Sequence, residues 1–294
     1  MTSIAVIAHR KKLLGGGLDE LREILANHGY PNPLWYEASK SRETGKLAKK
    51  AVADGAQLIF LWGGDGTVQR CVNAVVNCEV ELAILPAGTA NLLATNLGIP
   101  IHLARSVEVG LNGVGRRLDV GVLNDKCFAV MAGIGIDAVV MEKVDSALKD
   151  RLGRFAYFWT GIRALRFDPL HAVVRVDGEE WFTGRATCIL IGQMNSIGGS
   201  VSVFPEGQPD DGVVEVGVVT AQNVREWFRV LARLATNSAH LSPLTKMTQG
   251  HDIDVVLDRA TPYELDGGAR KAQRHFTASV KPGAITVRVP RLEL

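Results

Sequence analysis

The chain lacks most of the features that mark secreted, zinc-binding or nucleic-acid-binding proteins. Its 294 residues include only four cysteines, at positions 71, 78, 127 and 188, and no Cys-x-x-Cys pair. This spacing excludes a disulfide framework and a cysteine zinc site. The formal charge is only +2, from 33 basic and 31 acidic side chains, which argues against a general nucleic-acid binder. No basic segment followed by an apolar one opens the sequence, so we expect no secretory signal and a cytoplasmic protein.

No hydrophobic run is suited to crossing a membrane. Two long uncharged stretches occupy residues 82–104 and 186–205. The first contains Pro86, Gly88 and Pro100 and the second contains several serines, glycines and amides, whose polar groups would be unsatisfied in lipid. Hydrophobic residues nevertheless make up 47% of the chain and charged residues 22%, so the chain can build a packed core.

The first 110 or so residues alternate short apolar runs with helical patterns. Each of four apolar runs is followed by residues at helical spacing; the runs lie at 4–8, 34–36, 58–62 and 82–85. Repeated strand–helix units predict an open, mostly parallel sheet with helices on both faces. This part of the chain is the predicted N-terminal α/β domain, residues 1–115.

After Gly113 the pattern changes to many short apolar runs separated by Gly, Asp and Pro. Such a pattern predicts an antiparallel β domain, which we assign to residues 116–294. Strands are expected at 117–123, 127–131, 172–176, 181–183, 188–191, 213–219, 253–257, 276–280 and 285–289. Helices are expected near 154–167 and 223–235.

The segment Gly63-Gly64-Asp65-Gly66-Thr67 is the strongest local signal for a ligand. Its glycines allow the backbone to approach a ligand and to turn amides toward it. Thr67 and the amino terminus of the following helix favour a phosphate at this point. Because Asp65 would repel a bare anion, the segment indicates a magnesium–nucleotide complex. The alternative is a tight strand-to-helix turn in which Asp65 is a cap.

A second loop, Pro86–Asn91, follows the next apolar run in the same way. Ligands of open α/β sheets bind beyond the carboxyl ends of the strands, so the two loops could converge on one ligand. Thr89 and Asn91 would then offer hydrogen bonds to it, although an ordinary capped turn is an equal alternative. Neither loop is a Walker A sequence, and the chain has no Gly-x-Ser-x-Gly elbow of the serine hydrolases.

Five Asp-Gly dipeptides begin at Asp54, Asp65, Asp177, Asp211 and Asp266. Between strands, Asp-Gly is mainly a hairpin signal. We interpret Asp54 and Asp177 as turn or helix-end residues. For Asp211 and Asp266, spacing alone does not decide between a turn and a catalytic role.

Taken in order, these segments resemble the diacylglycerol kinase catalytic family, which includes bacterial lipid kinases, sphingosine kinases and ceramide kinases. The resemblance extends over residues 4–290. It rests on residues 63–67 together with Leu85–Asn91, Leu97–Pro100, Gly133–Ala138, Gly198-Gly199, Pro209–Gly212 and Leu265–Gly267.

The resemblance implies phosphorylation of a lipid hydroxyl by ATP and Mg²⁺, the acceptor being diacylglycerol or a related lipid alcohol. Members of the family join an α/β nucleotide domain to a β-sandwich-like domain, with the active site in the cleft. The glycine-rich segment 63–67 and Thr89 would hold the nucleotide. Asp211 would bind Mg²⁺ with the backbone carbonyls around Gln208 and Val213. Asp266 would accept the proton of the attacking hydroxyl.

The sequence also departs from the family pattern. Its amino-terminal phosphate loop is replaced by Ala8–Lys11 leading to Gly15–Gly17, with Arg10 and Lys11 expected near the phosphates. Leu92–Thr95 stands where many members have Asp-Phe-Ala-Arg.

Gly268 is the third departure, because the family commonly has Glu after its late Asp-Gly. Loss of that carboxylate removes a proton acceptor or a member of a metal network. A catalytically impaired regulatory homologue that still binds nucleotide or lipid is therefore one alternative. An NAD kinase, which also has Gly-Gly-Asp-Gly, is another, although residues 86–100 resemble the lipid kinases instead.

The helix expected near 223–235 is amphipathic and basic. Arg225, Arg229 and Arg233 recur at four-residue spacing, where like charges repel each other and an anionic membrane surface would offset the cost. We therefore expect transient contact with the inner membrane surface, with a core-packed helix and a solvated face as the simpler alternative. The sequence leaves open which lipid alcohol is the acceptor and whether the chain forms a homodimer.

Overall fold

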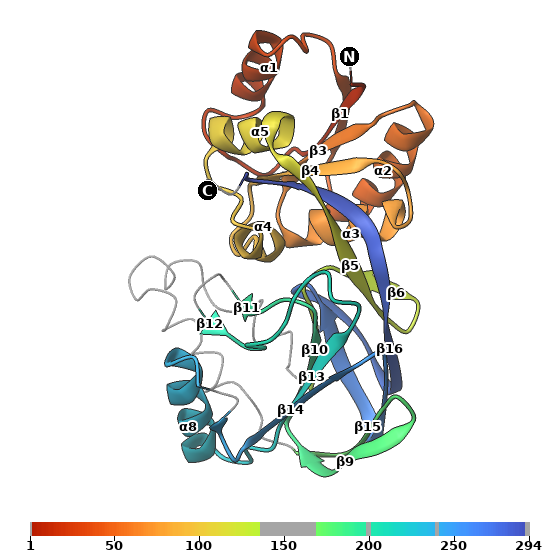
Figure 1. Ribbon diagram of the computed structural model, residues 1–294, viewed down its shortest axis with the longest axis vertical. Coiled ribbons are helices and arrows are strands. Elements are labelled where there is room, and N and C mark those ends of the chain that lie inside the picture. Colours follow the sequence, from red (N-terminus) through yellow and green to blue (C-terminus); the bar gives the residue numbers. More distant parts are fainter. Residues whose placement is uncertain (1, 136–168, 198–200, 239–240, 292–294) are drawn as a thin grey trace.

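The computed structural model describes residues 2–135, 169–197, 201–238 and 241–291. Two layered parts are stacked along the long axis of the molecule, the N-terminal helices and parallel strands at one end and the C-terminal antiparallel strands at the other (Figure 1). Fourteen of the described strands belong to a single sheet that runs through both parts. The predicted fold class, an α/β part followed by a β-sandwich-like part, is confirmed.

The N-terminal part is built on four parallel strands in the order β2-β1-β3-β4. Strand β1 is buried along its whole length: Ala5 and Ile7 face a core shared with α2 and α3, whereas Val6 and Ala8 face a core shared with α1 and α5. Both faces of the sheet are thus covered, which explains the continuous apolar runs. The elements are β1 (Ile4–His9), α1 (Leu18–Asn27), β2 (Leu34–Ala38), η1 (Ser41–Glu43), α2 (Thr44–Ala53), β3 (Leu58–Gly63), α3 (Asp65–Val75), β4 (Glu81–Pro86), α4 (Leu92–Asn96) and α5 (Leu103–Asn112).

The C-terminal part is antiparallel wherever its described strands pair with one another. Alternate residues of β13 and β10, such as Val216 and Ile191, are fully buried in a second core. The elements are β5 (Val114–Leu123), β6 (Lys126–Phe128), β7 (Met131–Ile134), β8 (Leu170–Val176), β9 (Glu179–Ala186), β10 (Cys188–Gly192), β11 (Ser196–Ile197), β12 (Val201–Ser202), β13 (Val214–Val219), α8 (Val224–Ala235), β14 (Thr245–Gly250), β15 (Asp252–Leu265) and β16 (Gly268–Val289).

The strands of this part differ from the prediction mainly in length. The two strands expected at 276–280 and 285–289 are one 22-residue strand, β16, because the chain only bulges between them. Strand β15 continues to Leu265, well beyond the expected end at 257. Strand β14 was not expected, because this edge strand has a mostly polar sequence. The helix expected at 154–167 lies outside the described residues.

Strand β16 joins the two parts. It pairs with β15 and β5 and then runs parallel to β4, with Val287 opposite Leu82. Ile285 and Val287 are buried in the same core as Ile7 of β1. The N-terminal core thus contains residues from the far end of the chain, and the division at residue 115 stays a prediction.

The described helices include none with the length and apolar character needed to span a bilayer. The four cysteines are free thiols, three of them buried.

Candidate active site

The glycine-rich loop and the Pro86–Asn91 loop lie side by side because β3 and β4 are neighbours that end together, with Gly63 opposite Pro86. Their backbones touch. A Cβ atom on Gly88 would lie 2.5 Å from the Cα atom of Gly64, closer than real Cβ atoms come. Both loops therefore need glycine where they cross.

Asp65 ties the two loops together. It is the first residue of α3, and its Oδ1 and Oδ2 accept hydrogen bonds from the backbone amides of Leu92 (2.5 Å) and Asn91 (3.0 Å) at the start of α4. Burial raises the pKa of Asp65 above its ordinary value, whereas these hydrogen bonds and the charge of Lys12 oppose the rise. The carboxylate is thus a cap for α4, supplied by the neighbouring loop.

Asn91 closes its own loop. Its Oδ1 accepts a hydrogen bond from the Gly88 amide (2.8 Å), and its Nδ2 donates one to the Gly88 carbonyl (3.0 Å). Thr67 is buried against Gly63. Gly66 and Thr89, by contrast, are exposed at the carboxyl end of the sheet. Of the predicted nucleotide residues these two are the exposed ones, and Asp65 is half-buried.

Asp266 lies in the tight turn between β15 and β16, with a φ angle of +45°. It is only 4% exposed, and its carboxylate accepts hydrogen bonds from the amides of Ala129 (2.8 Å), Val130 (2.9 Å) and Met131 (3.0 Å). Oδ2 accepts only the first of these and keeps a lone pair. Burial raises the pKa of Asp266 to about 6, the three amides oppose the rise, and the negative charge of Asp65 adds to it.

Asp211 belongs to a different group of carboxylates. It lines a pocket of about 410 Å³ with Glu206 and Gln208, the other walls being Asn195, Pro205, Gly207 and Gln249. Glu215, on the adjoining strand β13, is 5% exposed, and neither of its carboxylate oxygens has a hydrogen-bond partner among the described residues. Burial raises the pKa of Glu215 to about 7, and the charges of Asp211 and Glu206 add to the rise.

The Asp211 pocket has the oxygen-bearing side chains that Mg²⁺ prefers, beside a buried carboxylate without a partner among the described residues. In that part of the chain, however, no three His, Cys, Asp or Glu side chains are grouped so that they could hold a metal ion by themselves. Asp211 accepts a hydrogen bond from the Val213 amide (3.2 Å), which orients its carboxylate within the turn.

The structure therefore sorts the three predicted aspartates into two groups. The charge of Asp65 acts on Asp266, whereas the charges of Asp211 and Glu206 act on Glu215. The turn that carries Asp211 is held by Asp119 of β5, which accepts a hydrogen bond from the Gly212 amide (2.6 Å).

Three further residues are functional candidates that the sequence alone did not indicate. Lys12 lies within electrostatic range of Asp65, Glu264 within that of Asp266, and Arg270 within that of both Asp266 and Arg70. Glu264 is 8% exposed and its Oε2 has no partner among the described residues. Its only local signal is a charged residue in the otherwise uncharged run Thr261–Leu265.

The predicted amino-terminal phosphate loop has internal contacts of its own. Arg10 forms an ion pair with Glu37 (2.7 Å), and the Gly16 amide donates to the Glu20 carboxylate. Both groups thus have partners within the chain.

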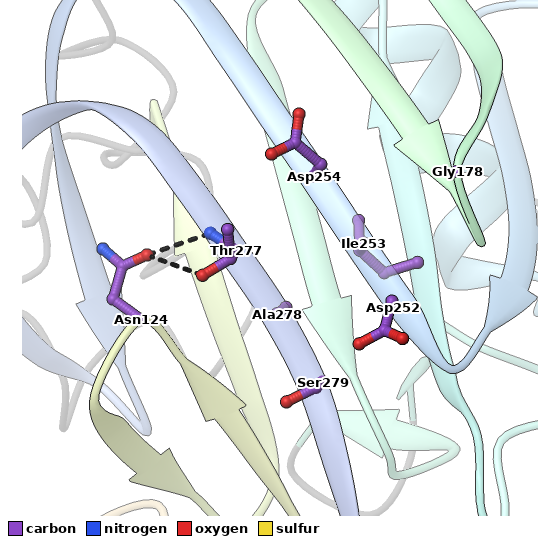
Figure 2. A pocket seen from close by; sticks show the side chains of 8 residues that line it. All are labelled: Asn124, Gly178, Asp252, Ile253, Asp254, Thr277, Ala278 and Ser279. Atoms are coloured by element: carbon purple, nitrogen blue, oxygen red, sulfur yellow. Dashed lines mark hydrogen bonds between the residues drawn. The ribbon is translucent and has the colours of Figure 1, made fainter.

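A further pocket, of about 260 Å³, contains none of the predicted site residues. Figure 2 shows it between β15 and β16, with Asp252 and Asp254 on one strand and Thr277 and Ser279 on the other. Asp254 is hydrogen-bonded to Nε2 of His275 (2.5 Å) and forms an ion pair with Arg175 (3.4 Å).

Comparison with known proteins accounts for nearly the whole chain. A family model described as the diacylglycerol kinase catalytic domain matches residues 11–123, and one described as the YegS C-terminal NAD kinase beta sandwich-like domain matches residues 130–289. The diacylglycerol kinase of Bacillus subtilis is 31% identical over 225 residues, which are 75% of this chain and 74% of that protein. The chain belongs to the diacylglycerol kinase family.

A further relative agrees with this membership, and solved structures share the fold. An Enterobacter protein named "Probable lipid kinase YegS-like" is 27% identical over 84% of this chain and 83% of its own. The crystal structure of a diacylglycerol kinase from Bacillus anthracis superposes with a TM-score of 0.81 at 20% identity, covering 99% of this chain and 98% of that one. The NAD kinase of Archaeoglobus fulgidus in complex with ATP gives 0.54 at 12% identity, covering 97% and 93%. These two likenesses concern the fold of this family member.

Proposed function

We propose that this member of the diacylglycerol kinase family is a lipid kinase that uses ATP and Mg²⁺ to phosphorylate diacylglycerol or a related lipid alcohol. The observation that carries the proposal is the coupling of Asp65 to Asp266. Two glycine loops tied by one carboxylate lie next to a second, buried carboxylate whose pKa is near 6.

The nucleotide would bind at the exposed edge of the two loops. Gly66 and Thr89 are exposed there, beside the amino terminus of α3, where backbone amides favour phosphate. Gly63, Gly64, Thr67 and Asn91 would act by fixing the shape of the loops, since their contacts lie within them. The related NAD kinase fold, crystallised with ATP, supports the use of that nucleotide.

Asp266 would be the general base. With a pKa of about 6, its carboxylate is ionised at neutral pH yet remains basic enough to accept a proton. The acceptor hydroxyl would give its proton to Oδ2 as its oxygen bonds to the terminal phosphorus, and the bond between that phosphorus and the oxygen bridging to ADP would break. The three amides on Asp266 would hold it in place.

Asp211 would hold Mg²⁺ with the carbonyls of Gln208 and Val213, and Glu215 would add negative charge to that pocket. When bound, Mg²⁺ neutralises charge on the phosphates during phosphoryl transfer.

A catalytically impaired regulator is the second candidate, and Gly268 favours it. Without the carboxylate that the family commonly has there, Asp266 would be the sole proton acceptor at the late Asp-Gly turn.

The test is a transfer assay with purified protein, γ-labelled ATP, Mg²⁺ and a panel of lipid alcohols that includes diacylglycerol, with NAD as a further acceptor. The proposal predicts labelled phosphate in the lipid fraction. Nucleotide binding without transfer to any lipid would support the regulator instead, and labelled NADP would support an NAD kinase.

A further inference from the structure

The side chain of Arg270 fills the space that Gly268 leaves. Its Nη1 lies 2.9 Å from where a Cβ atom on Gly268 would be. Nη1 donates to the carbonyls of Gly268 and Ala269, both at 3.0 Å, and Nη2 donates to Oε1 of Gln69 on α3 (3.4 Å). A guanidinium thus stands at the turn position where the family commonly has a carboxylate.

No carboxylate contacts the Arg270 guanidinium directly within the described part of the chain, although the charge of Asp266 acts on it from farther away. All three hydrogen-bond acceptors are neutral, and neither Arg270 nor Arg70 forms an ion pair with a carboxylate in the described part of the chain. Partial burial lowers the pKa of Arg270, and the positive charge of Arg70 lowers it further. Two guanidinium groups that repel each other at a half-buried position form a place where an anion is stabilised.

The position of Arg270 links it to the proposed reaction. Gln69, which holds its Nη2, is one turn along α3 from Asp65, and the other end of the Gln69 amide donates to the Cys127 carbonyl (2.7 Å). The amides that hold Asp266 begin two residues later, at Ala129. Asp266 itself interacts electrostatically with Arg270. The guanidinium therefore lies at the junction of α3, the 127–131 segment and the Asp266 turn.

We propose that Arg270, supported by the charge of Arg70, binds the terminal phosphate of the nucleotide. This inference rests on the proposed function, because it assumes that ATP occupies the glycine loops. A guanidinium presents paired N–H donors that match phosphate oxygens, and it neutralises charge on the phosphoryl group as the acceptor oxygen bonds to phosphorus and ADP leaves. The guanidinium would occupy the place of the family carboxylate without taking over its function, because it acts on the phosphate rather than on the proton.

The test compares Arg270→Gln with Lys271→Gln, an exposed neighbour on the same strand that removes the same charge. Calorimetric titration with Mg·ATP and with Mg·ADP is the first readout. Arg270→Gln should weaken ATP binding about tenfold and leave ADP binding nearly unchanged, because only ATP carries the terminal phosphate. Lys271→Gln should bind both as the wild type does, and Arg270→Lys should recover part of the ATP affinity.

Equal losses of ATP and ADP affinity, or no loss of either, would overturn the proposal. So would a wild-type protein that binds neither nucleotide. A change confined to the KM of phosphate-bearing acceptor lipids would assign the guanidinium to the acceptor and would also overturn it. These titrations need no lipid turnover. If the protein transfers phosphate to no lipid, the proposed function is wrong, but the difference between ATP and ADP affinity can still be measured.

Gly268→Glu gives a second, independent test. The new side chain would displace the guanidinium and place a carboxylate beside the phosphate, so ATP affinity and the rate of transfer should both fall. If Gly268→Glu instead raises the transfer rate, Gly268 impairs catalysis in the wild type and the assignment of Arg270 is wrong. Unfolding in urea, measured for each variant, checks that the protein is folded.

Discussion

Asp65 gives the simplest prediction about a single side chain. Asp65→Asn keeps the size of the side chain, but its amide group cannot accept the hydrogen bonds of both Asn91 and Leu92. One buried amide is left without an acceptor, so the free energy of unfolding should fall by about 1–3 kcal/mol. The two loops should separate and nucleotide binding should be lost, as calorimetry would measure. Asp19→Asn, at an exposed position in α1, is the control, and wild-type ATP affinity in Asp65→Asn would contradict the account.

Glu264 predicts a pH dependence of stability. Burial, with a contribution from Asp266, raises the pKa of Glu264 from 4.5 to about 7. Between pH 4.5 and about pH 7 the folded protein therefore binds more protons than the unfolded chain. The stability contributed by protonated Glu264 is present below pH 4.5 and is lost as the pH rises to about 7. Glu264→Gln should remove this loss, which is about 3 kcal/mol at most.

Urea unfolding at about pH 5 and about pH 8 measures the effect of Glu264 as the difference between variant and wild type. Relative to the wild type, Glu264→Gln should be more stable at the higher pH than at the lower one. Glu179→Gln, at an exposed position on β9, should follow the wild type at both. An identical pH dependence in Glu264→Gln and wild type would show that Glu264 is not the titrating group.

How far the site could be predicted depends on whether its contacts are local. The loop around Asp65 is readable because a strand, three glycines and a helix follow one another along the chain. The alternative interpretation, a cap for the helix that follows, is wrong: Asp65 makes no cap hydrogen bond in α3 and instead accepts the amides at the start of α4, which follows the next strand. Glu264 and Arg270 were missed because their surroundings come from β7 and α3, which lie more than a hundred residues away in sequence.

At the scale of elements, the close crossing of the two glycine loops predicts that a side chain at Gly88 would not fit. Gly88→Ala would bring a methyl group to 2.5 Å from the Gly64 Cα atom, and backbone at both sides has to move. The free energy of unfolding should fall by about 2–3 kcal/mol and ATP binding should weaken sharply. Gly66→Ala is the matched control for folding, since its methyl group meets only Ser41, at 3.9 Å. Equal stability of the two variants would contradict the described crossing.

The strands show where periodicity fails as a guide. Strands β1 and β3 were predicted well because each is short, apolar and buried along its whole length. The edge strand β2 is mostly half-buried and extends two residues beyond its predicted end. Strand β16 was divided in two because Pro282 and Gly283 resemble a turn, although the chain continues in one direction through a bulge. Strand β14 has no alternation of apolar and polar residues that would predict it. It is held as a strand by backbone pairing with β13.

For the molecule as a whole, β16 predicts how the N-terminal part behaves alone. A fragment of residues 1–115 lacks Ile285 and Val287, so the β4 edge and part of its core are exposed to water. The fragment should aggregate or stay unfolded. Appending residues 284–290 through a flexible linker should restore a cooperative unfolding transition, followed by circular dichroism. A fragment 1–115 that folds cooperatively without them would support an autonomous domain ending at 115.

Helix α8 carries the proposed membrane contact. Trp227 and Val230 are buried against the C-terminal part, whereas Val224 and Phe228 are about half exposed beside the arginine series. Phe228→Ser should lower binding to vesicles that contain anionic phospholipid, measured by cosedimentation, and the loss should be larger at high salt, where the attraction of the arginines is screened. Val114→Ser, at an exposed position on β5, should bind like the wild type. Undiminished binding of Phe228→Ser would exclude this face of α8.

The most direct test of the account is the initial rate of phosphate transfer from ATP to diacylglycerol as a function of pH. The wild-type rate should rise with pH and level off above about 6, as Asp266 loses its proton and can act as a base. Asp266→Asn, shown to be folded by urea unfolding, should transfer phosphate at least about a hundredfold more slowly and without that rise. Transfer by Asp266→Asn at the wild-type rate, or no labelled lipid from the wild type at any pH, would contradict the account.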